Sequence, residues 1–213
     1  MSKTFKQLIA VISSGFLLFL VYYGSYLPLR KSQIFIDALR NVKSIRSPQD
    51  LASLLTPPLE APSPIGQEEL VRNASNLILD FVRQGANGEF LSQSLDFLEK
   101  YYTPIINRGR GMSFEQNLYL LGTLNEYAFI QTKNPKNFVT AKIYYLKGLE
   151  LGPKRPQFLY GLFDLYRFEK NISELNKIKD QILSQWPDDK RTQQVYDQYM
   201  QEVAKEKPVK SAK

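Results

Sequence analysis

The 213-residue chain, 43% hydrophobic and 13% aromatic, has the composition of a folded protein and the length of one or two domains. It contains neither Cys nor His, which excludes disulfides, thiolate nucleophiles, Cys/His zinc sites and His-based catalytic triads. The formal net charge of +7 comes largely from lysines within residues 1–6 and 205–213, so the charge favours nucleic-acid binding only weakly.

Residues 7–29 carry no charged side chain, and their apolar part, residues 8–23, reads LIAVISSGFLLFLVYY. Its ten Leu, Ile, Val and Phe residues favour membrane insertion by roughly 3 to 6 kcal/mol. Extended to Leu29, the helix would be about 33 Å long, which is enough to cross a bilayer. The tyrosines of residues 22–26 then lie where an interfacial aromatic belt belongs. We therefore expect residues 1–30 to form an uncleaved transmembrane anchor.

A cleaved signal peptide is the alternative interpretation, because the basic start and the apolar centre also suit one; Gly24-Ser25 is then the nearest cleavage candidate. For an uncleaved anchor, the flanking charges bear on orientation. Lys3 and Lys6 precede the span, whereas five basic residues follow it within residues 30–46. That count alone predicts that the bulk of the chain lies in the cytoplasm.

Residues 31–64 indicate a basic juxtamembrane helix followed by a Pro-rich linker. Apolar positions at helical spacing within residues 33–45 suit either a helix lying on the membrane surface or one packed on the domain. The segment Ser47–Asp50 predicts the start of a short helix ending near Leu55. After it, TPPLEAPSP at residues 56–64 predicts an extended linker or a stiff crossover.

Beyond residue 65 every long segment has helical periodicity, and no segment alternates with the period of a strand, so we expect no sheet. Helices are expected at 66–84 and 88–106, joined by a Gly-rich turn. NRGRG, residues 107–111, is interpreted as a helix-ending turn rather than as a nucleic-acid-binding segment. Ser113 opens a third helix as part of a capping box.

A short motif then recurs along the chain. Q-x-L-Y-x-L occurs at residues 116–121 and again at residues 157–162, and its first half recurs at residues 193–196 with Val195 in place of the Leu. Pro153 and Pro187 lie 34 residues apart and each closes a predicted helix. A 34-residue period with two helices per unit resembles the tetratricopeptide repeat.

The family's consensus frames fall on particular residues of this chain. The W-x2-L-G-x2-Y frame falls on Leu159, Leu162, Phe163 and Tyr166, and the A-x3-F…P frame falls on Ala141, Tyr145 and Pro153.

The chain departs from these frames in three places. Phe163 replaces the family's Gly, and Leu175 and Lys179 stand at the frame's Ala and Phe in the next unit. In the earlier unit Gly122 matches the frame's Gly, but seven residues are inserted between it and Ala141. We expect that insertion to lengthen the hairpin around residues 133–135.

The resemblance covers roughly residues 113–205, with the helices at 66–84 and 88–106 as a more degenerate pair. It implies a tetratricopeptide-like, right-handed stack of antiparallel helix pairs over residues 65–205. Together with the anchor, the expected fold is therefore all-α: one transmembrane helix followed by this stack. The last residues, 206–213, are expected to form a disordered basic tail.

A second resemblance concerns the layout of the chain. An apolar span, a basic helix, SPIGQEEL at residues 63–70 and terminal repeats are similar to the C-terminal end of bacterial O-antigen ligase or polymerase-like membrane proteins. The multi-span catalytic portion of those proteins has no counterpart in this sequence. The resemblance therefore implies a location and a partnership with a membrane-embedded polysaccharide-assembly enzyme, and no transferase activity.

In tetratricopeptide repeats the first helix of each unit lines a concave groove. The resemblance implies that a partner peptide, extended or helical, would bind between polar and aromatic side chains there. Solvated polar faces, with the tyrosines packed between helices, are the equally open alternative. The implied groove residues are Gln116, Tyr119, Thr123, Glu126 and Tyr127 in one unit and Gln157, Tyr160, Asp164, Arg167 and Phe168 in the next.

Taken together, these patterns predict a non-catalytic, membrane-anchored scaffold for protein–protein interaction, with no cofactor, metal or nucleic acid. An accessory role beside an O-antigen ligase-like enzyme is the alternative function. A carboxylate-only hydrolase has no clustered residues to support it, since the acidic pairs Glu68-Glu69 and Asp188-Asp189 both stand at helix starts. We expect a single-pass protein of the cytoplasmic membrane whose soluble part lies outside the cytoplasm, as the family layout implies.

Overall fold

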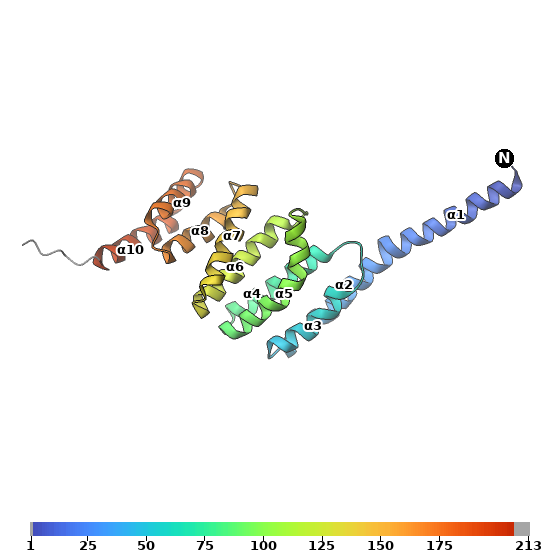
Figure 1. Ribbon diagram of the computed structural model, residues 1–213, viewed down its shortest axis with the longest axis horizontal. Helices are drawn as coiled ribbons and strands as arrows, with labels where there is room; N and C mark the ends of the chain where they lie inside the picture. Colours follow the sequence, from blue (N-terminus) through green and yellow to red (C-terminus); the bar gives the residue numbers. More distant parts are fainter. Residues whose placement is uncertain (1, 207–213) are drawn as a thin grey trace, which may run out of the picture. The chain divides into compact units, whose positions relative to one another are not determined.

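The computed structural model describes residues 2–206, whose regular structure is helical, with no strand among them. The chain divides into two compact units, which meet between Phe114 and Glu115. Unit 1 is the part up to Phe114 and unit 2 is the part from Glu115 onward (Figure 1). The predicted all-α class is confirmed.

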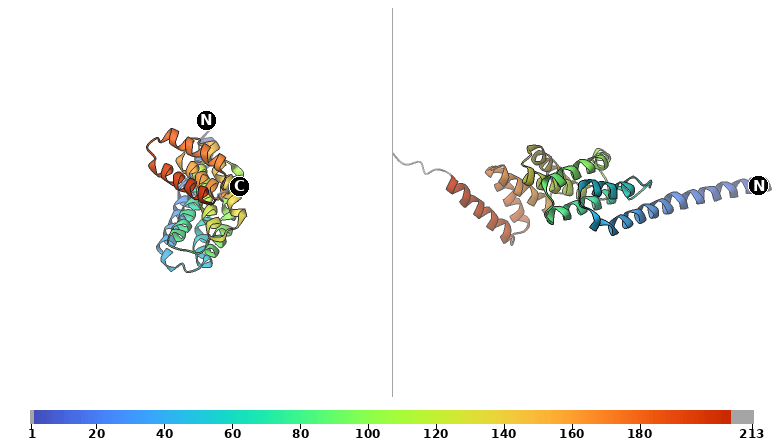
Figure 2. Two further views of the ribbon diagram at one scale, coloured as in Figure 1. Left: turned by 90° about the vertical axis from the view of Figure 1, so that its left-hand side faces the viewer. Right: turned by 90° about the horizontal axis from the view of Figure 1, so that it is seen from below.

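Unit 1 begins with one long helix made of three consecutive segments: α1 (Lys3–Val21), the π-helical η1 (Tyr22–Tyr26) and α2 (Leu27–Arg40). Over its 38 residues it is long and apolar enough to cross a membrane, and none of α1 is buried (Figure 2). The π turn has a local cause. Pro28, which lacks an N–H and whose ring crowds the carbonyl of Gly24, is accommodated by widening the turn before it.

The second half of this helix packs against the rest of unit 1. α2 buries Leu27, Lys31, Phe35 and Ala38, which recur on one face, and it lies against α3 (Pro48–Glu60). The predicted helix over residues 33–45 is therefore a continuation of the anchor helix. It ends at Arg40, and a 3₁₀ turn, η2 (Val42–Ser44), follows.

α3 is longer than the sequence pattern indicated. Its start is as predicted, with Ser47 and Asp50 forming a capping box and Pro48 in the first turn. Its end near Leu55 was wrong, because the helix continues through Pro57 and Pro58 to Glu60. Pro57 and Pro58 each forfeit a backbone hydrogen bond to the preceding turn, and burial of Pro58 and Leu59 outweighs that cost. The extended segment is thus shorter than the predicted linker.

α4 (Gln67–Arg83) and α5 (Gly88–Arg108) complete unit 1, close to the predicted ranges. Fully buried leucine, isoleucine and valine side chains from α3, α4 and α5 make its core: Leu51, Leu55, Val71, Ile78, Leu91 and Leu98. α5 ends at a left-handed Gly109, so the prediction that NRGRG is a helix-ending turn is confirmed.

Unit 2 contains α6 (Phe114–Thr132, whose first residue belongs to unit 1), α7 (Pro135–Leu151), α8 (Pro156–Phe168), α9 (Ile172–Gln185) and α10 (Lys190–Glu206). α8 packs against both α7 and α9, and α9 packs against α10 (Figure 1). The ends of α7 and α9 lie 34 residues apart, as do the starts of α8 and α10. The predicted tail falls almost entirely outside the described residues.

The seven inserted residues lengthen helices rather than the turn between them. α6 continues ten residues past Gly122, whereas α8 continues five past the equivalent Phe163. α7 begins six residues before Ala141, whereas α9 begins three before the equivalent Leu175. The turn between α6 and α7 is one residue shorter than the turn between α8 and α9. The hairpin is thus longer, as expected, although its turn at residues 133–134 is short.

Candidate functional site

The side chain of Tyr145 from α7 is the point at which three helices of unit 2 meet. It is 1% exposed. A Cβ added at Gly122 of α6 would come within 2.4 Å of one edge of its ring, and a Cβ added at Gly161 of α8 within 2.4 Å of the other. Because the backbones of α6 and α8 both touch the ring, any larger residue at either glycine would displace it. Glycine at these positions sets the close approach of the three helices.

Above Tyr145, α6 and α8 border a groove of about 580 Å³, here called the Tyr145 groove. Eight of the ten residues predicted from the tetratricopeptide resemblance line it. The predicted members are Tyr119, Thr123, Glu126, Tyr127, Gln157, Tyr160, Asp164 and Phe168, and the others are Ile130, Tyr145, Pro156 and Gly161.

Two predicted residues do not line the groove. Gln116 is exposed on α6, one turn before Tyr119. Arg167 forms an ion pair with Asp164 at 2.9 Å, within α8, and lines a neighbouring depression of about 400 Å³. Tyr145 itself was missed, because the resemblance places groove residues on the first helix of each unit. A signal was present in the sequence: the family's Phe is a Tyr here, whose hydroxyl needs a polar partner when buried.

That polar partner is Glu126. The Tyr145 hydroxyl donates a hydrogen bond to Glu126 Oε2 at 2.6 Å and lies 3.2 Å from Thr123 Oγ1. Burial raises the pKa of the Glu126 carboxyl to about 7; the Tyr145 hydrogen bond opposes this rise and the charge of Asp164 adds to it. Glu126 therefore exchanges its proton near neutral pH, and can either donate or accept a hydrogen bond in the groove.

On α8, Asp164 and Tyr160 are held by different partners. Burial raises the pKa of Asp164, and the charge of Arg167 opposes the rise. The Tyr160 hydroxyl donates to Asp189 Oδ2 at 2.7 Å, and its ring stacks on Trp186 with centroids 6.3 Å apart. Burial and this hydrogen bond raise the pKa of Tyr160 to about 12. The Tyr160 side chain is thus held by Asp189 and Trp186 while it also lines the groove.

Phe168 and Tyr127 form the more open part of the groove. Phe168 is exposed and meets Phe129 edge to face, with ring centroids 5.8 Å apart. Tyr127 is partly exposed and follows Glu126 on α6. The groove therefore combines an aromatic rim with a carboxyl and a hydroxyl at depth, an arrangement suited to holding a chain with both apolar and hydrogen-bonding groups.

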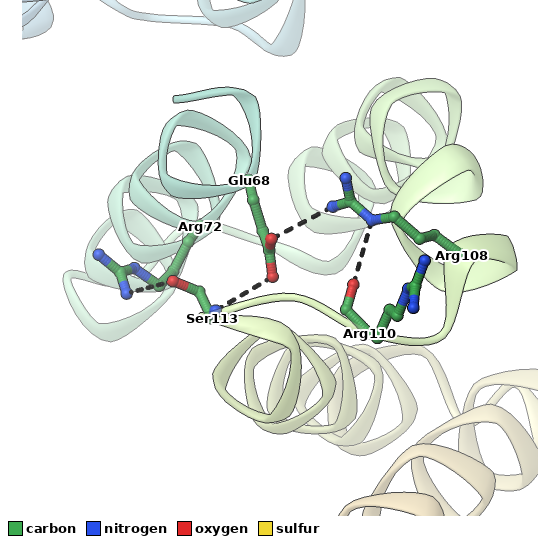
Figure 3. A network of polar contacts seen from close by, with 5 residues as sticks. All are labelled: Glu68, Arg72, Arg108, Arg110 and Ser113. Carbon is green, nitrogen blue, oxygen red and sulfur yellow. Dashed lines mark hydrogen bonds and ion pairs between the residues drawn. The ribbon is translucent and has the colours of Figure 1, made fainter. Parts of the chain in front are cut away.

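The acidic pairs at helix starts have structural partners. Glu68, near the start of α4, accepts hydrogen bonds from Arg108 and from the Ser113 backbone, as Figure 3 shows. Asp189 accepts from the backbone of Thr192 in the first turn of α10. Within residues 2–206, no group of three or more acidic side chains is placed to hold a metal ion.

Comparisons with protein-family models, with curated proteins and with solved structures find no match to this chain.

Proposed function

We propose that this protein is a non-catalytic, membrane-anchored scaffold whose Tyr145 groove binds a segment of a protein partner. One observation carries the proposal. Aromatic and polar side chains from α6, α7 and α8 converge on a single groove, and eight of them are residues at which the tetratricopeptide resemblance predicts contact with a peptide. Tyrosine is well suited to such a surface, because its rigid ring gives contact area at a low entropic cost.

The helical anchor supports the membrane part of the proposal. Every described residue before Leu27 is exposed, although most of α1 is apolar. A 19-residue apolar helix with no buried residue is unfavourable in water and favourable in lipid. We therefore propose that α1 and η1 span the bilayer and that α2 leaves it within its first turn, where the charge-free stretch ends at Leu29.

Site-specific photo-crosslinking tests the groove. A benzoylphenylalanine replacing Phe168, on the rim, should form one discrete crosslinked product in cells that make the protein naturally. The same amino acid at Val139, which is exposed on α7 and does not line the groove, is the matched control and should form none. Because Tyr127 lines the groove, Tyr127→Ala should reduce the Phe168 product severalfold while leaving helicity unchanged.

Equal crosslinking from Phe168 and Val139, or a Phe168 product that Tyr127→Ala does not change, would contradict groove binding.

The orientation of the protein across the membrane is tested separately by Ser184→Cys, at an exposed position of α9, which would give the chain its sole cysteine. Labelling of intact cells by an impermeant maleimide is expected, as the soluble part is proposed to lie outside the cytoplasm. Labelling only after lysis would place it in the cytoplasm.

A further inference from the structure

We propose that one edge of unit 1, formed by the α3–α4 and α5–α6 turns, lies on the lipid surface beside the point where the anchor helix leaves the membrane. This inference rests on the proposed membrane anchor. The edge is called the lipid-facing edge below. Its apolar members are the exposed side chains Ile65 and Met112.

The anchor helix joins unit 1 with no linker between them. The last residue of the charge-free stretch is Leu29, and Arg30 follows it. The first buried residue is Leu27, in the same helical turn. Since the helix continues without a break from α1 through α2, unit 1 begins to pack where the apolar stretch ends, and it cannot drift away from the bilayer on a flexible tether.

Lys31 fixes the α3–α4 turn beside this exit point. Its side chain is buried, with 4% exposed, and its ammonium donates to the carbonyl of Ala61 at 2.8 Å and to the side chain of Gln67. These two partners flank the α3–α4 turn, residues 61–66. Because Lys31 is only four residues past Leu27, the turn lies about 6 Å along the helix from the first buried residue.

A second contact network holds the α5–α6 turn to the same edge. Glu68, in the first turn of α4, accepts hydrogen bonds from Arg108 at 3.2 Å and from the Ser113 backbone at 3.1 Å (Figure 3). Gly111 lies between them with φ 154°, and a Cβ there would come within 2.2 Å of the Glu68 carboxylate. The turn between α5 and α6 is thus pressed against the start of α4.

The two turns present apolar side chains to solvent. Ile65 is 61% exposed and Met112 is 97% exposed. Both line one shallow depression of about 440 Å³, together with Pro64, Pro104 and Arg108. A methionine that is almost fully exposed and an isoleucine that is mostly exposed are unfavourable in water. On adjoining turns, both are suited to the boundary between lipid headgroups and acyl chains.

The charges around the edge are compatible with anionic headgroups. Arg30 and Arg110 are exposed and Glu69 lines the depression, while Lys100 and Arg108 already pair with Glu60 and Glu68. A basic side chain near an anionic surface is attracted to it, so two arginines add modestly to the apolar contact. A lipid surface is the occupant that fits, because the edge lies beside the proposed membrane span.

Depth-dependent fluorescence quenching tests the inference on the full-length protein in liposomes of phosphatidylcholine with a third phosphatidylglycerol. The chain has no native cysteine, so Ile65→Cys and Met112→Cys can each carry a single fluorophore. Leu39→Cys is the matched control, an exposed apolar position of unit 1 that lies about 18 Å along α2 from Leu27. Lipids with a nitroxide near the headgroup should quench the probes at 65 and 112 severalfold more than the probe at 39.

Quenching at 65 and 112 no greater than at 39 would overturn the lipid-facing edge. A further probe, Leu17→Cys in α1, separates this result from failure of the anchor. If lipids with a deep nitroxide quench the probe at 17 while 65 and 112 resemble 39, the span stands and the edge is wrong. If 17 is not quenched, the anchor fails and the edge falls with it.

Discussion

Glu126 is the residue whose charge state should govern the stability of unit 2 near neutral pH. Its pKa is raised from 4.5 to about 7, so the folded state binds a proton that the unfolded state releases. The contribution of Glu126 to the stability of unit 2 is therefore greatest below about pH 4.5, falls as pH rises towards 7, and levels off above it. The loss is at most about 3 kcal/mol, since one pKa unit corresponds to 1.36 kcal/mol.

The variant Glu126→Gln removes this titration while keeping a hydrogen-bond acceptor for Tyr145. Urea unfolding should show it to be more stable than the wild type at pH 8, by about 1–3 kcal/mol, with the difference disappearing near pH 4. Glu150→Gln, at an exposed position of α7, is the control and should track the wild type. A pH-independent difference for Glu126→Gln would contradict the assignment.

At Gly161 two opposing effects can be compared by size. Replacing a helical glycine by alanine ordinarily stabilises by about 1 kcal/mol. Here the added Cβ would lie within 2.4 Å of the Tyr145 ring, which cannot retreat because Gly122 backs its other side. Overpacking costs about 1–3 kcal/mol, so we expect Gly161→Ala to destabilise unit 2 in urea unfolding.

A double-mutant cycle isolates the ring as the cause. In a Tyr145→Val background the clash is absent, so Gly161→Ala should become neutral or stabilising. If Gly161→Ala destabilises equally in both backgrounds, the contact with the Tyr145 ring does not account for the effect.

Some of this site could be predicted from single residues and some could not. The recurring Q-x-L-Y motif placed Tyr119 and Tyr160 on the facing helices, because residues at one position of a repeat occupy similar places. The motif could not show that Arg167 forms an ion pair with Asp164 of the same helix, since side-chain pairing depends on neighbours in space. Nor could it show that Tyr145 reaches Glu126 from α7.

Among the helices, α3 offers the clearest test of a local signal. The Ser47 side chain accepts from the backbone of Asp50, and Asp50 accepts in return from the backbone of Ser47. Loss of such a cap costs about 1 kcal/mol, so Ser47→Ala should destabilise unit 1 by that amount in urea unfolding. Ser53→Ala is the same change in the middle of the same helix, at an exposed position, and should be neutral or slightly stabilising.

Equal effects of Ser47→Ala and Ser53→Ala would show that the cap does not stabilise α3. The start of α3 was predictable because capping is a local interaction. Its end was not: Pro57 and Pro58 oppose helix locally, but burial of Pro58 and Leu59 in unit 1 outweighs that preference. The inserted residues of unit 2 illustrate the same limit, because a sequence offset gives the number of added residues and not whether helix or turn receives them.

At the scale of the whole molecule, the division into two units predicts that a destabilising substitution affects only the unit that contains it. Hydrogen exchange on the full-length protein should show that Gly161→Ala accelerates exchange of amides in α6 to α8 and leaves α3 to α5 unchanged. Ser47→Ala should do the reverse. Accelerated exchange in both units from either single variant would mean that the chain unfolds as one cooperative body.

In the proposed membrane-anchored state, the unbroken helix from α1 to α2 would give bilayer thickness a mechanical role. The charge-free stretch is about 35 Å long, some 5 Å more than a typical hydrocarbon core, and a helix absorbs such an excess by tilting. A membrane thinner or thicker by a few Å would change that tilt by about 10°. Because no hinge separates the helix from unit 1, unit 1 would turn through the same angle, with Ile65 and Met112 moving into or out of the headgroups. The thickness of the membrane would thereby set the orientation of unit 1 relative to the bilayer.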